Sequence, residues 1–184
     1  MKLEKKFIEF CSSKKLEINL NQIEIINTLE NFQNINFDRS FLNSFFKKNS
    51  KLGFYLHGDV GVGKTMILDF FFKQLKIKKI KVHFNEFMIS FHDFMFENDK
   101  KDKALDIFVK KLKNKAKLNF FDEFQVTNIV DAMILGRLFE KIFEKKICVL
   151  FSSNIKINDL YKDGLQRDQF LPFLKILKEN SIEK

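Results

Sequence analysis

Residues 58–65, GDVGVGKT, decide the fold class of this chain, because they match the phosphate-loop pattern GxxxxGK[ST]. The glycines of this loop permit backbone conformations that turn several N–H groups toward one anion. A short apolar strand pattern, LGFYLH, precedes the loop, and a helical pattern, KTMILDFFFKQLK, follows it. The positive end of that helix points at the same anion. The stretch therefore predicts a P-loop that binds the phosphates of a nucleotide.

Two side chains at the end of the loop extend this prediction to ATP and Mg²⁺ as cofactors. Lys64 can reach the terminal phosphates and assist catalysis, and the hydroxyl of Thr65 can ligate the metal ion. The predicted nucleotide-binding residues are Gly58, Asp59, Val60, Gly61, Val62, Gly63, Lys64, Thr65 and Met66.

An acidic pair ends a second apolar stretch, LNFFDE, at residues 118–123. Asp122 is predicted to hold the magnesium ion, directly or through water. Glu123 then lies beside the metal and can orient or deprotonate the water that attacks the terminal phosphate. The pair changes the prediction from ATP binding to ATP hydrolysis.

Polar residues also follow the apolar run ICVLF, at Ser152, Ser153 and Asn154. A side chain at the end of this strand can hydrogen-bond the attacking water or the terminal phosphate. Arg167 opens a late helix and is a candidate arginine finger, which would contact a nucleotide held by a neighbouring subunit. A surface salt bridge with Asp163 or Asp168 is the alternative for Arg167. Arg137 is the other candidate for a contact across an interface, and it can instead pair with Glu140 along its helix.

Strand and helix patterns alternate along residues 51–184, which predicts an α/β fold with a mostly parallel sheet flanked by helices. Active groups of such sheets collect at the carboxyl ends of the strands, where every motif above lies. Residues 1–50 are predicted to form a helical segment that packs on this core, because Leu20, Ile23, Ile26 and Leu29 recur at helical spacing. Thr127 is a candidate N-cap of the helix that follows the acidic pair, and Pro172 suits the first turn of the last helix better than its middle.

Charge and composition narrow the remaining function classes. The chain has 33 basic and 24 acidic residues, a formal net charge of +9, and only three arginines. Nucleic-acid binding is possible but not favoured, because no motif of basic residues interleaved with aromatic ones stands out. Cys11 and Cys148 form no CxxC motif, and the spacing of His83 and His92 is not that of a zinc site. No apolar stretch is long enough for a membrane span, and the amino terminus is not a convincing signal peptide, so the cytoplasm is expected.

Four segments together resemble the ZapE-type cell-division ATPases and their mitochondrial relatives, a branch of the AAA+ ATPases. They are GFYLHGDVGVGKTMILDFFF, KVHFNEFMISFH, NFFDEFQVTNIVDAMILGRLFE and DLYKDGLQRDQFLPF. The resemblance covers residues 7–178, and residues 122–139 are its most specific part. The family usually has a histidine at the position of Asn85 and a second arginine at the position of Gln169.

The resemblance implies an AAA+ core that couples ATP hydrolysis to the remodelling of a protein partner, within a homo-oligomer in the bacterial cytoplasm. In ZapE-type proteins the partner is the FtsZ division ring, and the mitochondrial relatives help to remove respiratory-chain subunits. By position, Lys64 and Thr65 would be the Walker A pair, and Asp122 and Glu123 the Walker B pair. Asn154 would be the sensor residue and Arg167 the arginine finger.

Family members continue past the length of this chain. They add a core strand beside the P-loop strand and a small helical lid, so we expect both to be missing here and the P-loop strand to have an unpaired edge. This length leaves a second function open, that of a truncated nucleotide-binding or interaction module without efficient hydrolysis. The charge and the P-loop leave a third open, a helicase-loader-like ATPase that acts on nucleic acid.

Overall fold

The computed structural model describes residues 2–37, 50–98 and 101–184. Residues 38–49, which belong to the predicted amino-terminal helical segment, lie outside this part. The elements, in chain order, are α1 Leu3–Ser13, α2 Leu20–Phe37, β1 Gly53–His57, α3 Lys64–Gln74, β2 Lys79–His83, α4 Phe84–Phe96, α5 Lys101–Lys115, β3 Leu118–Asp122, α6 Ile129–Glu144, β4 Cys148–Ser153, the 3₁₀ turn η3 Ile157–Asp159, α7 Arg167–Asn180 and β5 Ser181–Glu183.

The strands form one sheet in the order β2-β3-β4-β1-β5, and each neighbouring pair is parallel. The parallel α/β sheet predicted from the alternating pattern is confirmed. The register aligns the carboxyl ends of the strands, with His83 opposite Asp122 and His57 opposite Ser153. The P-loop, the acidic pair and the polar run after β4 therefore meet at one edge of the sheet.

The expectation of an unpaired edge at the P-loop strand is wrong, because β5 pairs with β1 in parallel. Its backbone bonds reach the end of β1: the Lys184 amide donates to the Tyr55 carbonyl at 2.9 Å, and the His57 amide donates to the Lys184 carbonyl at 2.9 Å. β5 has only three residues, and one of them is apolar, so its sequence is too short to show the alternating pattern that predicts a strand.

The close approach of β5 to β1 depends on Gly53. A Cβ atom at this position would lie 2.2 Å from Ser181 Oγ and 3.0 Å from Ser181 Cβ. We expect Gly53→Ala to lower the free energy of unfolding by about 1–3 kcal/mol, the usual cost of overpacking, as measured by urea denaturation. Gly136→Ala is the control, because its nearest neighbour would be 3.9 Å away. Equal stability of the two variants would contradict this account, and Ser181→Gly should restore part of the loss in Gly53→Ala.

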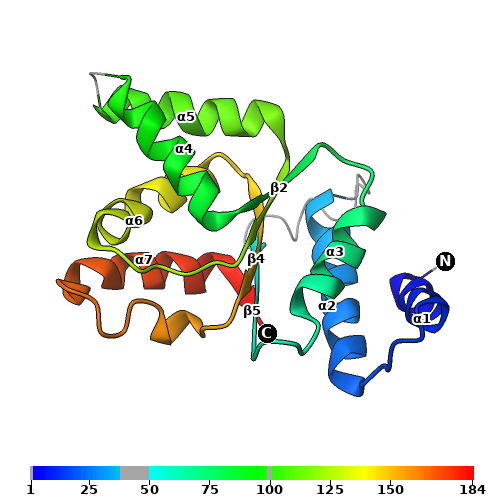
Figure 1. The fold of residues 1–184 in the computed structure, drawn as a ribbon. Coiled ribbons are helices and arrows are strands. Elements are labelled where there is room, and N and C mark those ends of the chain that lie inside the picture. Colours follow the sequence, from blue (N-terminus) through cyan, green and yellow to red (C-terminus); the bar gives the residue numbers. More distant parts are fainter. Residues whose placement is uncertain (1, 38–49, 99–100) are drawn as a thin grey trace.

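Helices cover both faces of the sheet (Figure 1). One face carries α1, α2 and α3, and the other carries α4, α5, α6 and α7. On the first face, the Phe7 ring of α1 packs 5.1 Å from the Phe70 ring of α3, and the Phe32 ring of α2 packs 6.0 Å from the Phe54 ring of β1. Leu20 does not join the predicted packing stripe of α2, because it is 87% exposed.

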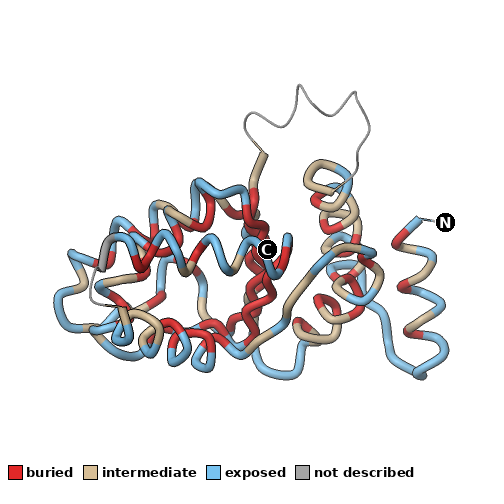
Figure 2. The backbone as a smooth tube through the Cα atoms, turned by 90° about the horizontal axis from the view of Figure 1, so that it is seen from above, coloured by how far each residue is buried: buried red, intermediate tan, exposed pale blue. Residues whose placement is uncertain are grey.

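Phenylalanine fills the core between the sheet and the second helical layer, and buried residues gather along the sheet and on the helix faces turned toward it (Figure 2). Phe124 lies at the centre of this layer. Its ring centroid is 4.3 Å from that of Phe84 and 4.9 Å from that of Phe151. Because Phe124 directly follows the acidic pair, its burial fixes where the chain leaves β3.

Two helix details differ from the sequence expectations. Asn128, not Thr127, caps α6, because its side-chain oxygen accepts the Asp131 amide at 2.8 Å. Pro172 lies inside α7, in its second turn, although a proline there removes one helical hydrogen bond. In the described part of the chain, no helix is both long and apolar enough to cross a membrane.

Candidate functional site

The P-loop joins β1 to α3 through glycines in a left-handed conformation. Gly61 has φ 88° and Gly63 has φ 90°, values that a side chain rarely permits. Gly63 occupies the N-cap position of α3, so Lys64 begins the helix. The Lys64 ammonium lies inside the loop, where it donates to the carbonyls of Gly58 at 2.7 Å and Asp59 at 2.6 Å. Burial lowers the pKa of Lys64, and the nearby Asp59 carboxylate opposes that shift.

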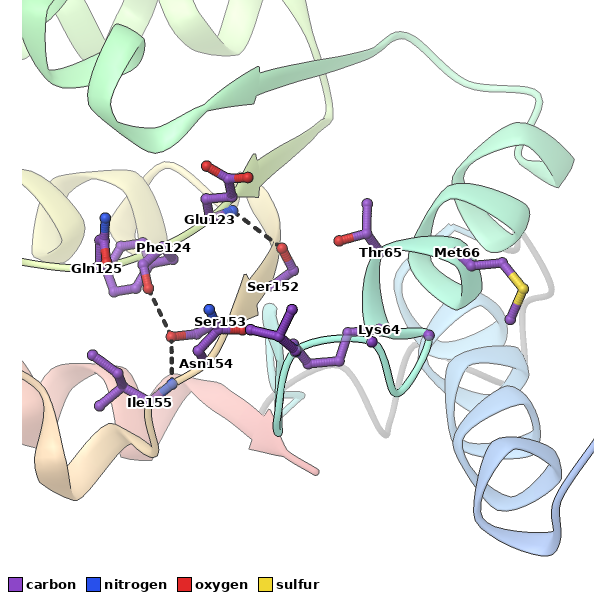
Figure 3. Close-up of a pocket in the computed structure, with 13 residues that line it drawn as sticks. Lys64, Thr65, Met66, Glu123, Phe124, Gln125, Ser152, Ser153, Asn154 and Ile155 are labelled. Carbon is purple, nitrogen blue, oxygen red and sulfur yellow. Dashed lines mark hydrogen bonds between the residues drawn. The ribbon is translucent and has the colours of Figure 1, made fainter.

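A pocket of about 430 Å³ opens between the P-loop, the turn after β3 and the turn after β4 (Figure 3). The lining residues predicted for the site are Val60, Gly61, Gly63, Lys64, Thr65, Met66, Glu123 and Asn154. The other predicted loop residues, Gly58, Asp59 and Val62, line a second hollow of about 470 Å³ that Lys64 also lines.

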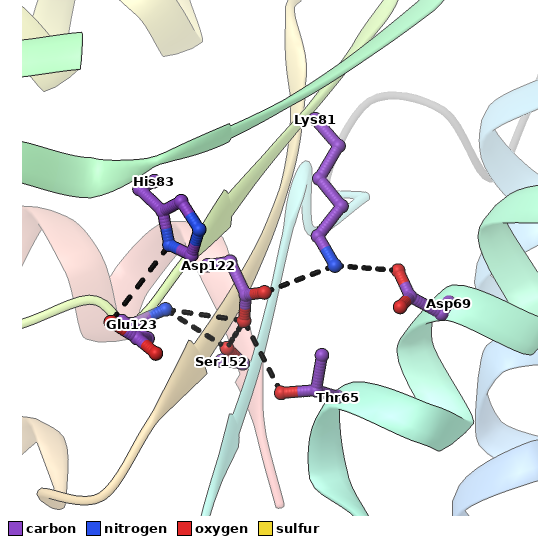
Figure 4. A network of polar contacts seen from close by, with 7 residues as sticks. All are labelled: Thr65, Asp69, Lys81, His83, Asp122, Glu123 and Ser152. Carbon is purple, nitrogen blue, oxygen red and sulfur yellow. Dashed lines mark hydrogen bonds and ion pairs between the residues drawn. The ribbon is translucent and has the colours of Figure 1, made fainter. Parts of the chain in front are cut away.

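Asp122 lies behind this pocket and is 5% exposed. Its Oδ1 accepts the Thr65 hydroxyl at 3.2 Å, the Glu123 amide at 3.2 Å and the Ser152 hydroxyl (Figure 4). Its Oδ2 forms an ion pair with the Lys81 ammonium at 3.0 Å. The end of β3 is thereby tied to α3, β4 and β2 through a single carboxylate.

The contacts of Asp122 determine its charge. Burial alone would raise its pKa, but the hydrogen bonds from Ser152 and Lys81, the charge of Lys81 and the hydroxyl of Thr65 outweigh burial and lower the pKa below its ordinary value. Asp122 is therefore a carboxylate at neutral pH. Lys81 also forms an ion pair with Asp69 at 2.8 Å. Burial would lower the pKa of Lys81, but its two carboxylate partners outweigh burial and raise the pKa above its ordinary value.

The chemistry of these residues fits a magnesium ion. Magnesium is bound through oxygen ligands and keeps several of its waters, and the Thr65 hydroxyl and an Asp122 carboxylate oxygen converge to 3.2 Å. Both cysteines of the chain, Cys11 and Cys148, are buried elsewhere in the core.

Glu123 projects away from this network. Its backbone has φ 54°, an uncommon conformation for a residue other than glycine, and its side chain is 76% exposed. The amide of Glu123 is anchored by Asp122 Oδ1 and by Ser152 Oγ, both at 3.2 Å. One carboxylate oxygen lies 3.8 Å from His83 Nδ1. The left-handed turn thus lets adjacent residues face different ways: Asp122 points inward, and Glu123 lies at the rim of the pocket with its carboxylate turned toward His83.

The polar run after β4 divides into two buried residues and one exposed residue. Ser153 donates to the Phe124 carbonyl at 2.7 Å and accepts the Ile155 amide at 3.1 Å, so it shapes the turn. Ser152 anchors Asp122. Asn154 is exposed and lines the pocket beside the P-loop. Among the three, Asn154 has the position from which a side chain can meet a bound phosphate.

The structure does not bring Arg167 into the pocket of its own chain. Its guanidinium donates to the carbonyls of Asn158 at 2.8 Å and Leu160 at 3.0 Å, and no described carboxylate pairs with it. Arg137 lies exposed on α6. His92 bonds to Asp131 at 2.6 Å, a contact between α4 and α6.

No functional motif in the sequence points to Lys81 or Gln22, and the polar run after β4 predicts contact with water or phosphate for Ser152, not its bond to Asp122. The only signal for Lys81 is a charged residue within a strand. Gln22 is 8% exposed and lies against the P-loop, since its Nε2 would be 3.4 Å from a Cβ at Gly63. Its pairing with Asn19 at the start of α2 resembles a capping box, which is the signal that was available.

Residues 11–182 match the family of AFG1-like ATPases. The cell division protein ZapE of Escherichia coli K12 is 36% identical over 129 residues, which is 70% of this chain and 34% of that protein. Lactation elevated protein 1 homolog B of Danio rerio is 37% identical over 146 residues, 72% of this chain and 29% of that protein. The chain thus spans about a third of the length of these curated relatives.

Solved structures agree on the fold. DnaI has a TM-score of 0.61 at 18% identity, over 92% of this chain and 87% of that one. The DnaC helicase loader has a TM-score of 0.60 at 15% identity, over 90% of each chain. These likenesses show a P-loop AAA+ fold and nothing finer. Because the family match extends over most of this chain, the chain belongs to the AFG1-like ATPase family.

Proposed function

We propose that this chain binds ATP with Mg²⁺ and hydrolyses it in the pocket between the P-loop and the turns after β3 and β4. The observation that supports the proposal is that two adjacent acidic residues have different environments. Asp122 is buried and lies 3.2 Å from the Thr65 hydroxyl, while Glu123 is exposed in the same pocket as Lys64. This difference supports a metal-binding role for Asp122 and a water-activating role for Glu123.

Each residue then has a role set by its position. Lys64 and the amides of the loop hold the phosphates, and Thr65 and Asp122 hold the metal, which neutralises charge on the phosphates. Glu123 orients or deprotonates the attacking water, and Asn154 hydrogen-bonds that water or the terminal phosphate. Gly58, Asp59 and Val62 belong to the same loop and complete the nucleotide contacts from the second hollow.

We further propose that turnover remodels a protein partner in cell division. The support is the likeness to the Escherichia coli cell division protein ZapE, and an FtsZ-type division protein is the partner that this likeness suggests. Arg167 would act in a neighbouring copy, since it lies outside the pocket of its own chain with its guanidinium half-buried. The active state is then a homo-oligomer, in the cytoplasm.

The test is phosphate release from ATP by the purified chain, with Mg²⁺ and with Mg²⁺ removed by EDTA, together with binding of a fluorescent ATP analogue. We expect release that depends on Mg²⁺ and rises more steeply than linearly with protein concentration. Lys64→Ala should lose both binding and release. Phosphate release by Lys64→Ala at the rate of the unsubstituted chain would contradict the proposed site.

A second candidate is a nucleotide-binding module without efficient turnover. The observation that favours it is that Arg167 lies outside the pocket of its own chain, where its guanidinium donates to the carbonyls of Asn158 and Leu160. Saturable ATP binding without phosphate release at high protein concentration would select this candidate, and sustained release would eliminate it. Absence of ATP binding would contradict both.

A further inference from the structure

Lysines are concentrated at the end of the sheet where the strands begin, opposite the pocket. We call this end of the sheet the amino-terminal edge and define it by the segments that immediately precede the five strands, residues 50–52, 75–78, 113–117, 144–147 and 178–180. Because all strands are parallel, these segments lie side by side. The Lys117 amide donates to the Lys78 carbonyl at 2.8 Å, and the Lys117 carbonyl accepts the amide of Cys148, the first residue of β4, at 3.0 Å.

The charge of this edge differs from that of the opposite edge. The five segments contain two glutamates, Glu144 and Glu179, and nine lysines: Lys51, Lys76, Lys78, Lys113, Lys115, Lys117, Lys145, Lys146 and Lys178. The segments that follow the strands, residues 58–63, 84–86, 123–128, 154–159 and 184, contain two lysines and four acidic residues. The formal charge is therefore +7 over the segments before the strands and −2 over the segments after them.

These lysines are available to a partner. All except Lys51 are exposed, and Lys51 instead caps the carbonyls of Lys178 and Glu179 at 2.7 and 2.6 Å. Within the described residues, no carboxylate forms a salt bridge with the exposed lysines of the edge. The two glutamates there are engaged elsewhere, Glu144 with Lys141 at 3.4 Å and Glu179 with Lys175 at 3.9 Å. The edge therefore keeps its positive charge.

We propose that the amino-terminal edge binds the phosphate backbone of double-stranded DNA without regard to sequence. Five strands spaced by about 4.8 Å give an edge about 20 Å long, which is about six base pairs at 3.4 Å each. Lysines contact phosphates as point charges and read no bases. The exposed large apolar side chains of the described residues all lie outside the five segments, so the edge offers neither a ring for stacking on single-stranded bases nor an anchor for a lipid bilayer.

The test compares two charge-matched variants of the full chain by fluorescence anisotropy, using labelled duplexes of about 20 base pairs in two unrelated sequences. The edge variant carries Lys78→Gln, Lys115→Gln, Lys117→Gln and Lys145→Gln. The control variant carries Lys2→Gln, Lys5→Gln, Lys14→Gln and Lys162→Gln, four exposed lysines outside the edge. Circular dichroism and binding of an ATP analogue verify that both variants are folded.

We expect the unsubstituted chain to bind both duplexes alike and the edge variant to bind at least about tenfold more weakly. The slope of log K against log salt should become shallower by about 3 to 4, since each phosphate contact contributes about 0.9. The control variant should keep most of the affinity and slope. Because the two sites lie at opposite edges, MgATP should not compete with the duplex.

Three results would overturn the proposal. Equal weakening of the two variants would show that net charge alone drives binding. Absence of duplex binding at low salt would remove the site altogether. Binding only to vesicles of phosphatidylcholine with phosphatidylglycerol, lost in the edge variant, would assign the edge to an anionic membrane instead. None of these outcomes bears on ATP hydrolysis, which has its own test.

Discussion

Replacing Glu123 by Gln is expected to lower the rate of ATP hydrolysis at least about 100-fold, which is the smaller end of the usual contribution of a general base. The substitution keeps the shape of the side chain and removes a carboxylate at the rim of the pocket. ATP affinity should change by no more than about threefold, because the buried carboxylate at Asp122 and the loop contacts of Lys64 remain. Phosphate release and equilibrium binding of an ATP analogue measure the two quantities separately.

Glu86→Gln is the matched control, since Glu86 is also exposed at the carboxyl edge of the sheet and does not line the pocket. It should leave both turnover and binding unchanged. If Glu123→Gln retained the turnover of the control, Glu123 would not be the residue that activates water. If binding fell together with turnover, Glu123 would be a structural member of the turn after β3.

Replacing Lys81 by Met is expected to lower the free energy of unfolding by about 1.5 kcal/mol near pH 7, at the lower end for a hydrogen bond to a charged group because Lys81 is partly exposed. Methionine keeps a stem that can pack against Phe120, whose ring lies 4.8 Å from the Lys81 ammonium. The substitution removes the cation that neutralises two carboxylates, the buried Asp122 and Asp69 on α3.

This loss should depend on pH in a defined direction. The pKa of Asp122 is lowered in the folded chain, so its contribution to stability is present above the unfolded pKa of about 3.9 and disappears as pH falls through the folded pKa. Without Lys81 the folded pKa of Asp122 is higher. The difference between the two proteins should therefore be constant from about pH 7 to about pH 5, and should shrink at lower pH as Asp122 becomes protonated in both.

Urea denaturation followed by circular dichroism at several pH values measures this difference. Lys81→Arg should retain most of the stability, because it keeps the charge. Lys73→Met is a control, since Lys73 is an exposed lysine at the end of α3. A penalty for Lys81→Met that persisted unchanged below about pH 3.5 would show that packing of the lysine stem, and not the ion pair with Asp122, is what matters.

The sequence predicts best what a local pattern encodes. The P-loop and the strand that leads into Asp122 and Glu123 each occupy one uninterrupted stretch, and the structure places both at the carboxyl ends of the parallel strands, as expected. The cap of α6 was misplaced by one residue, since Thr127 and Asn128 are both good N-caps and only the backbone geometry separates them. β5 was missed because three residues carry no period.

The contacts that hold the site together were harder to predict. Asp122 is bound by residues 57 and 30 positions away in sequence, Thr65 and Ser152, and by Lys81 on a neighbouring strand. No spacing rule links these positions, because the order of the strands and their register bring them together. The roles of Lys64, Thr65, Glu123, Asn154 and Arg167 stay predictions that the proposed substitutions test.

The position of β5 also affects how this protein can be labelled. Glu183 accepts the Ile157 amide at 2.9 Å, and the Lys184 side chain pairs with Glu24 at 2.5 Å, so the end of this strand is clasped between η3 and α2 (Figure 1). Lys184 also lines the hollow beside the P-loop. A fluorescent protein or affinity tag joined directly after Lys184 would therefore lie next to the P-loop and would strain the contacts that Glu183 and Lys184 make. A label on the exposed face of α1 avoids both problems, since its ordered packing contacts are with α2 and α3.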